Sequence, residues 1–525
     1  MSAITLTHRR PPWYLTLPAL GSAAAVLLPL GYLVFQSFQA KELPSVWNKS
    51  SALLLSNTML LAGTVLLATT LLALPLAWLT VRTTLVGRRI FSVLCVLPLA
   101  IPGYVMAYAL LSLGGEYDSV LQNLFGWQVG RPKGFWGATL ALTAYNLPYM
   151  YLTLRAAMQD LDPSLEEAAR SLGRGRISVL WSVIRPQLQP AFLAGAMLVI
   201  LHVIADFGVV SLMGFDTFSR ELWTMYNTST AQETAPVAML LLGLACIFIA
   251  IEMAFLRKVR LDRAGIGVAR KQALFRLGFW HIPVFVLFAI VLLVSVIVPT
   301  GTVIYWLSRL DQPRIISDVW EALGKSVQGS IPAALLATLL AIPIAMMRAR
   351  FPSKRSFILE RLPFIGYATP ALAFALSLIM LCTADWVPDW FYELTYQTLP
   401  LLVFAYTFHF LAEAVGPVRS SMYLAGPRLE EASRSLGAGR VETFFRVTLP
   451  VLRHGLIVSM ALVFLSCMKE LPLTMLLAPP NFETLAKNVW DYTENVEFAK
   501  AAPHALAILI FSAAFVGVLL IEGRK

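Results

Sequence analysis

Long apolar stretches follow one another along the whole chain, and short polar segments separate them. A helix needs about 20 apolar residues to cross a bilayer. Twelve stretches approach or exceed this length and are predicted to be membrane spans: 15–36, 58–79, 90–112, 135–154, 190–213, 236–256, 279–306, 327–347, 357–381, 398–413, 451–477 and 502–521. We expect helices, because helices satisfy their own backbone hydrogen bonds in lipid, and the short alternating strands of a membrane barrel do not match these runs. The pattern predicts an all-α membrane protein.

The composition agrees with this interpretation. The 525-residue chain is 58% hydrophobic and 14% charged, whereas soluble domains carry about 25% charged residues. The first stretch follows Arg9 and Arg10, as the core of a signal peptide would. Its apolar run from Leu15 to Phe35 is too long for such a core. We therefore expect this first helix to be retained as a span.

Basic residues concentrate on one side of the predicted membrane. When the loops are assigned alternately to two sides, the side with both termini holds 30 of the 41 lysines and arginines, and the other side holds ten. The last one, Lys469, lies inside a predicted span. The positive-inside rule then places both termini and the loops 155–189 and 414–453 in the cytoplasm. The net charge of +11 is explained by topology, so we expect a lipid bilayer and no nucleic acid as partner.

These two loops contain the same segment. Leu165–Pro186 (LEEAARSLGRGRISVLWSVIRP) and Leu429–Pro450 (LEEASRSLGAGRVETFFRVTLP) are identical at 12 of 22 positions. We call their spacing, from position 165 to position 429, the repeat offset. Unrelated segments of ordinary composition share about one or two such positions. A polar segment repeated at the same place in two apolar halves indicates an internal duplication.

The duplication predicts two repeats, 1–256 and 279–525, joined by the basic segment 257–278. We interpret this segment as a cytoplasmic linker. Each repeat holds six predicted spans. Because six is an even number, both repeats cross the membrane in the same orientation and are parallel rather than inverted.

Each copy of the segment predicts a helix, a glycine turn and a second helix, which we call the first elbow (165–186) and the second elbow (429–450). Asp162-Pro163 and Gly426-Pro427 precede the elbows and are suited to begin a helix. Glycine then stands where each helix would end in a left-handed turn. We expect Glu166, Glu167, Glu430 and Glu431 on the exposed side, with small residues that permit close approach of another surface. An ordinary amphipathic surface helix is the alternative, but it does not explain the preserved identities.

The elbows resemble the EAA motif of permease subunits of binding-protein-dependent ABC importers, in which EAA is followed by three residues, a glycine, nine residues and I-x-L-P. The matching residues are Glu167-Ala168-Ala169, Gly173, Val183 and Arg185-Pro186, and Glu431-Ala432-Ser433, Gly437, Val447 and Leu449-Pro450. Valine replaces isoleucine in both copies, Arg185 replaces leucine and Ser433 replaces alanine. The resemblance implies the type I ABC importer permease fold, with two permease subunits fused in one chain.

In that family the elbow is a coupling helix that docks on the ATP-hydrolysing subunit. The coupling residues implied for this chain are Glu166, Glu167, Ala168, Ala169, Gly173, Glu430, Glu431, Ala432, Ser433 and Gly437. The implied partners are an ABC ATPase homodimer on the cytoplasmic side, which binds ATP and Mg²⁺, and a substrate-binding protein outside the bacterial inner membrane. This chain itself is expected to be no enzyme and to hold no cofactor. Its only fragment like a phosphate loop, Gly324-Lys325-Ser326, lacks the upstream glycine and lies on the outer side.

Two carboxylates, Asp206 and Glu470, are also separated by the repeat offset, and each is predicted well inside the span that follows its elbow. Buried carboxylates in a bilayer are costly and usually face a pathway or a partner. They would offer oxygen to a hard cation in transit; alternatively, Lys469 pairs with Asp206 and locks the two halves together. His202 has Ser466 as its counterpart, and we interpret it as a packing residue.

A second pair of candidate ligands is His409 with Glu413, which we place near the cytoplasmic end of a span. Their counterparts in the first repeat are Tyr145 and Tyr149, so we do not predict a metal site there.

The outer segments repeat as well. Phe215-Asp216-Thr217 parallels Phe482-Glu483-Thr484, at a spacing slightly longer than the repeat offset. We expect short amphipathic helices that dock the substrate-binding protein, with anchoring in the membrane interface as the alternative. The docking candidates are Asp216, Arg220, Trp223, Glu483, Lys487 and Trp490.

The cargo is suggested by resemblance alone. The stretches 205–220, 408–422 and 468–490 are most similar to the ferric-iron subfamily of these permeases. Thiamine, polyamine and phosphonate systems share the elbow and remain alternatives. A gradient-driven secondary transporter is the alternative of another class, but it would not need two matched elbows.

Overall fold

The computed structural model describes residues 11–39, 49–115, 118–161, 163–258, 274–312 and 314–522, so that Asp162 and most of the linker lie outside the described residues. The described part is helical apart from one isolated β-bridge, between Thr83 and Phe275. Eight of its helical runs are long and apolar enough to cross a membrane: Trp13–Gln39, Ser50–Arg82, Ile177–Ala205, Glu233–Ile251, Gly278–Leu307, Arg314–Arg350, Arg440–Met468 and Phe498–Gly517. The chain is a multi-pass membrane protein.

Three further predicted spans are bent pairs of helices. The run Arg88–Ala100, which contains α4 (Arg88–Leu94), turns by 91° into α5 (Gly103–Leu113). Helix α17 (Lys354–Ala368) turns by 102° into α18 (Ala371–Cys382), and α20 (Leu399–His409) by 50° into α21 (Leu411–Ala425). Pro102 and Pro370 precede α5 and α18. Proline lacks the N–H that would continue the first helix and favours an extended residue before it.

The predicted span 135–154 corresponds to α7 (Gly134–Gln159), which is not among the eight apolar runs. It packs between α3 (Lys49–Arg82) and α10 (Arg185–Ala205). Its polar residues, such as Asn146 and Thr143, are buried by these neighbours. With α7 and the bent pairs, all twelve predicted stretches are helical.

The predictions of unbroken spans over 190–213 and 451–477 were wrong. Helix α10 ends at Ala205 and is followed by the short α11 (Gly208–Leu212). Helix α24 (Leu449–Met468) is followed by α25 (Pro472–Leu477). Asp206 and Glu470 therefore lie at breaks between helices rather than within continuous ones.

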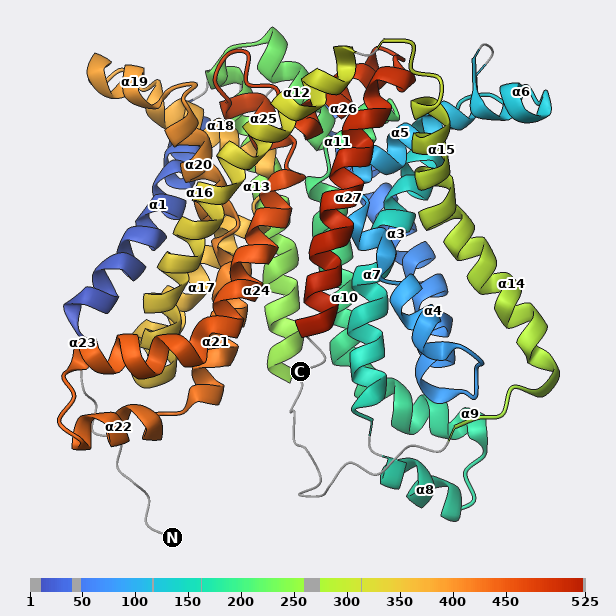
Figure 1. The fold of residues 1–525 in the computed structure, drawn as a ribbon, viewed down its shortest axis with the longest axis horizontal. Helices are drawn as coiled ribbons and strands as arrows, with labels where there is room; N and C mark the ends of the chain where they lie inside the picture. The colour runs from blue at the N-terminus through green and yellow to red at the C-terminus, as the bar shows by residue number, and fades with distance from the viewer. Residues whose placement is uncertain are drawn as a thin grey trace.

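The two repeats exchange their first helices. Helix α1 (Trp13–Gln39) packs against α16 (Arg314–Arg350), α17 and α18 of the second repeat. In return, Phe288 of α14 (His281–Leu292) packs on Phe91 of the first repeat, with ring centroids 4.4 Å apart. Figure 1 shows α1 beside α16 and α17, and α14 beside the first-repeat helices. Each bundle thus contains one helix from the other repeat.

The elbows define one end of the molecule. Their first helices, α8 (Pro163–Ser171) and α22 (Arg428–Ser435), both lie at the lower end in Figure 1. The helices α12 (Phe218–Thr228) and α26 (Leu485–Glu494) lie at the opposite end. The start of α1 and the end of α27 (Phe498–Glu522) point toward the elbow end. This common side for both elbows is the arrangement that parallel repeats predict.

Candidate functional site

A cavity of about 220 Å³ lies where the broken helices of the two repeats meet. It is bounded by the breaks before α5, α11, α18, α21 and α25. The polar side chains that line it are Tyr104, Tyr145, Tyr149, His202, Asp206, Tyr367, Thr369, His409, Glu413, Ser466, Lys469 and Glu470. Discontinuous helices around a cavity are the usual way in which membrane transporters place polar groups and irregular backbone inside a bilayer.

Many residues that line this cavity are related in pairs by the internal duplication. Nine lining positions of the first repeat have counterparts on the same cavity at the repeat offset, and in four of these pairs both side chains are polar. These four pairs are Tyr145 with His409, Tyr149 with Glu413, His202 with Ser466 and Asp206 with Glu470. The cavity therefore lies on the pseudo-twofold axis that relates the repeats.

His409 and Glu413 were misplaced by sequence reasoning. The structure puts them on the same cavity as Asp206 and Glu470, not near the elbow end of their span. The reason is the bend between α20 and α21, which brings this helix pair inward at residue 410. Their pairing with Tyr145 and Tyr149 through the repeat offset was the available signal for their position.

The three carboxylates on the cavity are held differently. An Oδ1 of Asp206 accepts the Val209 N–H at 2.9 Å, and an Oε1 of Glu470 accepts the Leu473 N–H at 3.1 Å, so both cap the short helices that follow. Glu413 instead accepts a hydrogen bond of 2.7 Å from the Ser466 hydroxyl on α24. The described residues do not show the alternative pairing of Lys469 with Asp206. The Lys469 ammonium instead donates to the Leu99 carbonyl at 3.2 Å. That bond joins the two repeats.

Most of the polar side chains that line the cavity carry oxygen atoms. Carboxylate and phenol oxygens come from both repeats, and Lys469 is the only lysine or arginine on the described wall of the cavity. Hard cations prefer such oxygen ligands. Within the described residues, no three His, Cys, Asp or Glu side chains are close enough to hold a metal ion. The oxygen atoms on this wall are of the kind that hard cations prefer.

Aromatic rings pack at the α12–α26 end of the cavity. Phe207, which lines the cavity, lies 5.2 Å from the Trp223 ring and 5.8 Å from the Trp490 ring, and the two indoles are 6.1 Å apart. Trp490 is only 4% exposed, so this docking candidate faces the interior of the protein. The carboxylates of Asp216 and Glu483 are exposed, and Asp216 pairs with Arg220. Lys487 is half-buried.

The turn that ends α8 and α22 is the predicted one. Gly173 has φ +80° and Gly437 has φ +92°, which confirms the left-handed turns. Leu172 and Leu436 beside them are 81% and 88% exposed. Glu167, Ala168, Glu431 and Ala432 are exposed, whereas Ala169 is buried and Ser433 is half-buried. The two elbows thus expose matched leucines beside their glycine turns.

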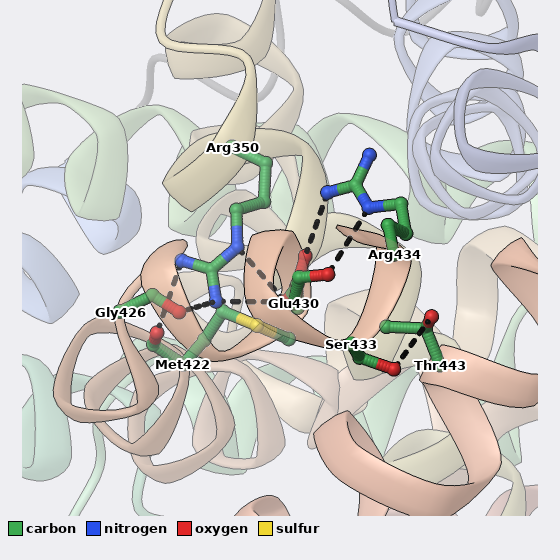
Figure 2. Close-up of polar contacts among 7 residues, drawn as sticks. All are labelled: Arg350, Met422, Gly426, Glu430, Ser433, Arg434 and Thr443. Carbon is green, nitrogen blue, oxygen red and sulfur yellow. Dashed lines mark hydrogen bonds and ion pairs between the residues drawn. The ribbon is translucent and has the colours of Figure 1, made fainter. Parts of the chain in front are cut away.

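Glu166 and Glu430 do not face outward, contrary to the sequence prediction. Their side chains are 14% and 12% exposed, and each forms an ion pair with an arginine that ends a membrane helix, Arg82 of α3 and Arg350 of α16. Figure 2 shows the second of these pairs. Sequence reasoning missed both arginines, because they lie outside the repeated segment and their spacing is slightly longer than the repeat offset.

Comparison with known proteins agrees with the duplication. The family model described as "Binding-protein-dependent transport system inner membrane component" matches residues 69–260 and again 337–522. The Fe(3+)-transport system permease protein FbpB 2 of Haemophilus influenzae is 31% identical over 512 residues, which cover 96% of this chain and 97% of that protein.

Two further relatives match about one third of the chain. The molybdenum transport system permease protein ModB of Escherichia coli K12 is 30% identical over 36% of this chain and 86% of its own length. The sulfate transport system permease protein CysT of Salmonella typhimurium is 29% identical over 35% of this chain and 68% of its own length. This chain belongs to the family of inner membrane components of binding-protein-dependent transport systems and carries two copies of the family's domain.

Proposed function

We propose that this chain is the translocation subunit of an ATP-driven importer for ferric iron. The observation that carries this proposal is the similarity to a ferric-iron permease along nearly the whole chain, both repeats included. The cavity between the repeats supports it, because carboxylates from both repeats line it and offer the ligands that a hard cation prefers. Iron is the cargo in this proposal and not a resident cofactor.

The energy comes from a separate ATPase dimer that binds ATP and Mg²⁺. The two elbows offer it matched surfaces at one end of the molecule, where Glu167 and Glu431 are the carboxylates proposed to contact it. This end is cytoplasmic in the proposal, as are both termini, because the basic residues gather there. When ATP closes the dimer, the elbows approach one another and the two bundles rock about their interface.

A substrate-binding protein delivers the cargo at the opposite end. The exposed residues of α12 and α26, together with Asp216 and Glu483, form the surface proposed to receive it. Trp223 of α12 and Trp490 of α26 form a cluster with Phe207, which lines the cavity. Alternating access requires this cluster to separate when the cavity opens outward.

An oxyanion is the second candidate cargo. The N-termini of α5 and α18 and the ammonium of Lys469 face the cavity, and helix N-termini favour anions. Two relatives are named for the transport of molybdenum and of sulfate, which supports a cargo of this class. Ferric iron is preferred, because three carboxylates line the same cavity against one lysine.

Uptake by cells with and without this chain tests the proposal. Radiolabelled ferric iron is offered beside labelled molybdate, sulfate, thiamine, putrescine and a phosphonate. Loss of ferric iron uptake alone, restored by the chain, is the expected result. If iron uptake is unchanged and uptake of another cargo is lost, ferric iron is not the cargo, but the chain is still an importer subunit. Uptake that survives ATP depletion while ion gradients persist would instead indicate a secondary transporter.

A further inference from the structure

We propose that Arg82 and Arg350 are positioning residues that fasten each elbow to a membrane helix, so that movement of the elbow is transmitted to the bundle. We call the pairs Arg82–Glu166 and Arg350–Glu430 the elbow clamps. The proposal rests on the proposed ATP-driven function, because it assigns the mechanical connection inside this chain. It gives Glu166 and Glu430 a different task from that of Glu167 and Glu431, which face the ATPase.

The second clamp joins three elements (Figure 2). Arg350 is the last residue of α16, and its Nε and Nη2 donate to Oε1 of Glu430 at 3.1 and 2.9 Å. The same guanidinium donates to the carbonyls of Gly426 at 3.0 Å and Met422 at 3.3 Å, at the end of α21. One side chain therefore connects a membrane helix, the end of a second helix and the elbow.

The first clamp repeats the arginine–glutamate pair, and among the described residues its guanidinium hydrogen-bonds only to the glutamate. Arg82 is the last residue of α3, and its Nη2 contacts both carboxylate oxygens of Glu166. Its guanidinium also lies over the Trp78 ring, 5.4 Å from the centroid, and its side chain is 3% exposed. Each repeat thus places an arginine at the end of one membrane helix against the first glutamate of the elbow.

The end of the linker is attached to the first clamp. The Phe275 N–H donates to the Arg82 carbonyl at 2.8 Å, and the Thr84 N–H donates to the Phe275 carbonyl at 3.0 Å. The Phe275 ring packs on Trp78 with centroids 5.7 Å apart. The segment that enters the second repeat is therefore held beside Arg82.

Neighbouring glutamates of the elbow face different ways. Successive residues of a helix point about 100° apart, so Glu430 can bond to its own chain while Glu431 is directed away from that contact. Arginine suits the inner position because its planar fork forms several directed bonds to a carboxylate and nearby carbonyls, which lysine does not. Removal of either partner leaves a partly buried charge without compensation. A connection of this kind transmits displacement in both directions, as pushing and as pulling.

The two arginines are equivalent positions of the two repeats. The matched ranges of the family model begin at residues 69 and 337, and this spacing is also that of Arg82 and Arg350. A pair that served the stability of one elbow alone would not need a counterpart in the other. The presence of both clamps fits an ATPase dimer that moves both elbows together.

The test uses the complex of this chain with its ATPase and binding protein in proteoliposomes. The variants are R82Q with R350Q, and the charge exchange R350E with E430R. Arg434→Gln is the matched control, because Arg434 lies 3.9 Å from the same Glu430 but is 44% exposed. Three quantities are measured: ATPase retained on purification, stimulation of ATP hydrolysis by loaded binding protein, and uptake per ATP hydrolysed.

We expect the R82Q, R350Q variant to retain the ATPase on purification. The stimulation of ATP hydrolysis by loaded binding protein and the uptake per ATP hydrolysed should each fall about tenfold or more, which is in the range of typical coupling energies. R434Q is expected to resemble the wild type, and the charge exchange to recover part of the coupling lost in R350E alone. Unchanged uptake per ATP in R82Q with R350Q overturns the proposal. Loss of the ATPase on purification also overturns it, because the arginines would then serve docking or folding. Absence of ATP-driven ferric iron uptake in the wild type refutes the proposed function separately, since stimulation of hydrolysis still reports on the clamps.

Discussion

At the scale of single residues, the three carboxylates on the cavity have different hydrogen-bond partners. Asp206 and Glu470 each cap a short helix through one carboxylate oxygen, whereas Glu413 is bonded to a serine on another helix. An amide in place of the first two retains an oxygen that accepts the same N–H. The charge and the helix cap are therefore separable by mutation.

The first prediction concerns that charge. We expect Asp206→Asn with Glu470→Gln to reach the membrane at normal levels, because the caps are retained, and to transport ferric iron about tenfold or more slowly, because the cation loses its charged ligands. Alanine at the same positions should also lower the melting temperature, since loss of a cap costs about 0.5–2 kcal/mol. Uptake and thermal unfolding measure the two effects. Wild-type uptake in the amide variant would remove these residues from the pathway.

The second prediction separates a buried from an exposed tryptophan. Trp490 is 4% exposed and packs on Phe207 and Trp223, whereas Trp127 is 62% exposed. Trp490→Ala should destabilise the protein by about 3–5 kcal/mol, as large-to-small changes in a core do. Trp127→Ala should change stability by less than about 0.5 kcal/mol. Melting curves of the purified variants in one detergent provide the comparison, and equal melting temperatures would contradict the packing described here.

At the scale of elements, hydropathy located the helices but not their breaks. An apolar run shows that a segment lies in the membrane, yet it carries no information on direction, so the turns near Pro102 and Pro370 were interpreted as straight spans. The carboxylates at 206 and 470 were found by their common offset, but their position at helix ends depends on tertiary packing. Sequence reasoning found the elbow and its glycine turns, because turn chemistry is local. It could not find the arginine partners of Glu166 and Glu430, because each partner is distant in the sequence and only the folded chain brings the two together.

The third prediction concerns the turn of the second elbow. Gly437 has φ +92°, and a Cβ added there meets no other atom within 4 Å, so Gly437→Ala acts only through backbone strain. Such strain costs about 1–2 kcal/mol for a residue other than glycine. We expect less ATPase to be retained on purification and slower uptake. Gly416→Ala inside α21 is the control, because it also meets no atom within 4 Å and has an ordinary helical conformation. Equal retention of the ATPase by both variants would contradict this role of the turn.

At the scale of the whole molecule, the exchange of first helices ties the two repeats together. Tyr108 donates a hydrogen bond of 3.2 Å to the Phe498 carbonyl across the repeats. The Ser37 hydroxyl of α1, a helix that packs on the second repeat, donates to the Ala235 carbonyl of its own repeat at 2.9 Å. The bundles share surface along α1 and along α14 and α15 (Val298–Leu307). In the proposed rocking motion, these shared helices would bend or slide.

The fourth prediction follows from this exchange. If the chain is cut within 259–273 and both parts are expressed together, they should assemble and be purified as one complex, because packing rather than the linker joins the repeats. Either part expressed alone should be degraded, since its bundle lacks one helix. Purification through a tag on one part measures the assembly. Recovery of the tagged part without its partner would show that the linker is required.

Ferric iron uptake by proteoliposomes that contain this chain, its ATPase and its loaded binding protein tests directly whether the elbows drive transport. The wild type is compared with a Glu167→Gln, Glu431→Gln variant, which keeps both elbow clamps and loses the carboxylates proposed to contact the ATPase. We expect uptake that requires hydrolysable ATP in the wild type and the loss of this uptake in the variant, with equal amounts of this chain in the membrane. Uptake without ATP, or wild-type uptake in the variant, would show that the elbows do not couple transport to ATP hydrolysis.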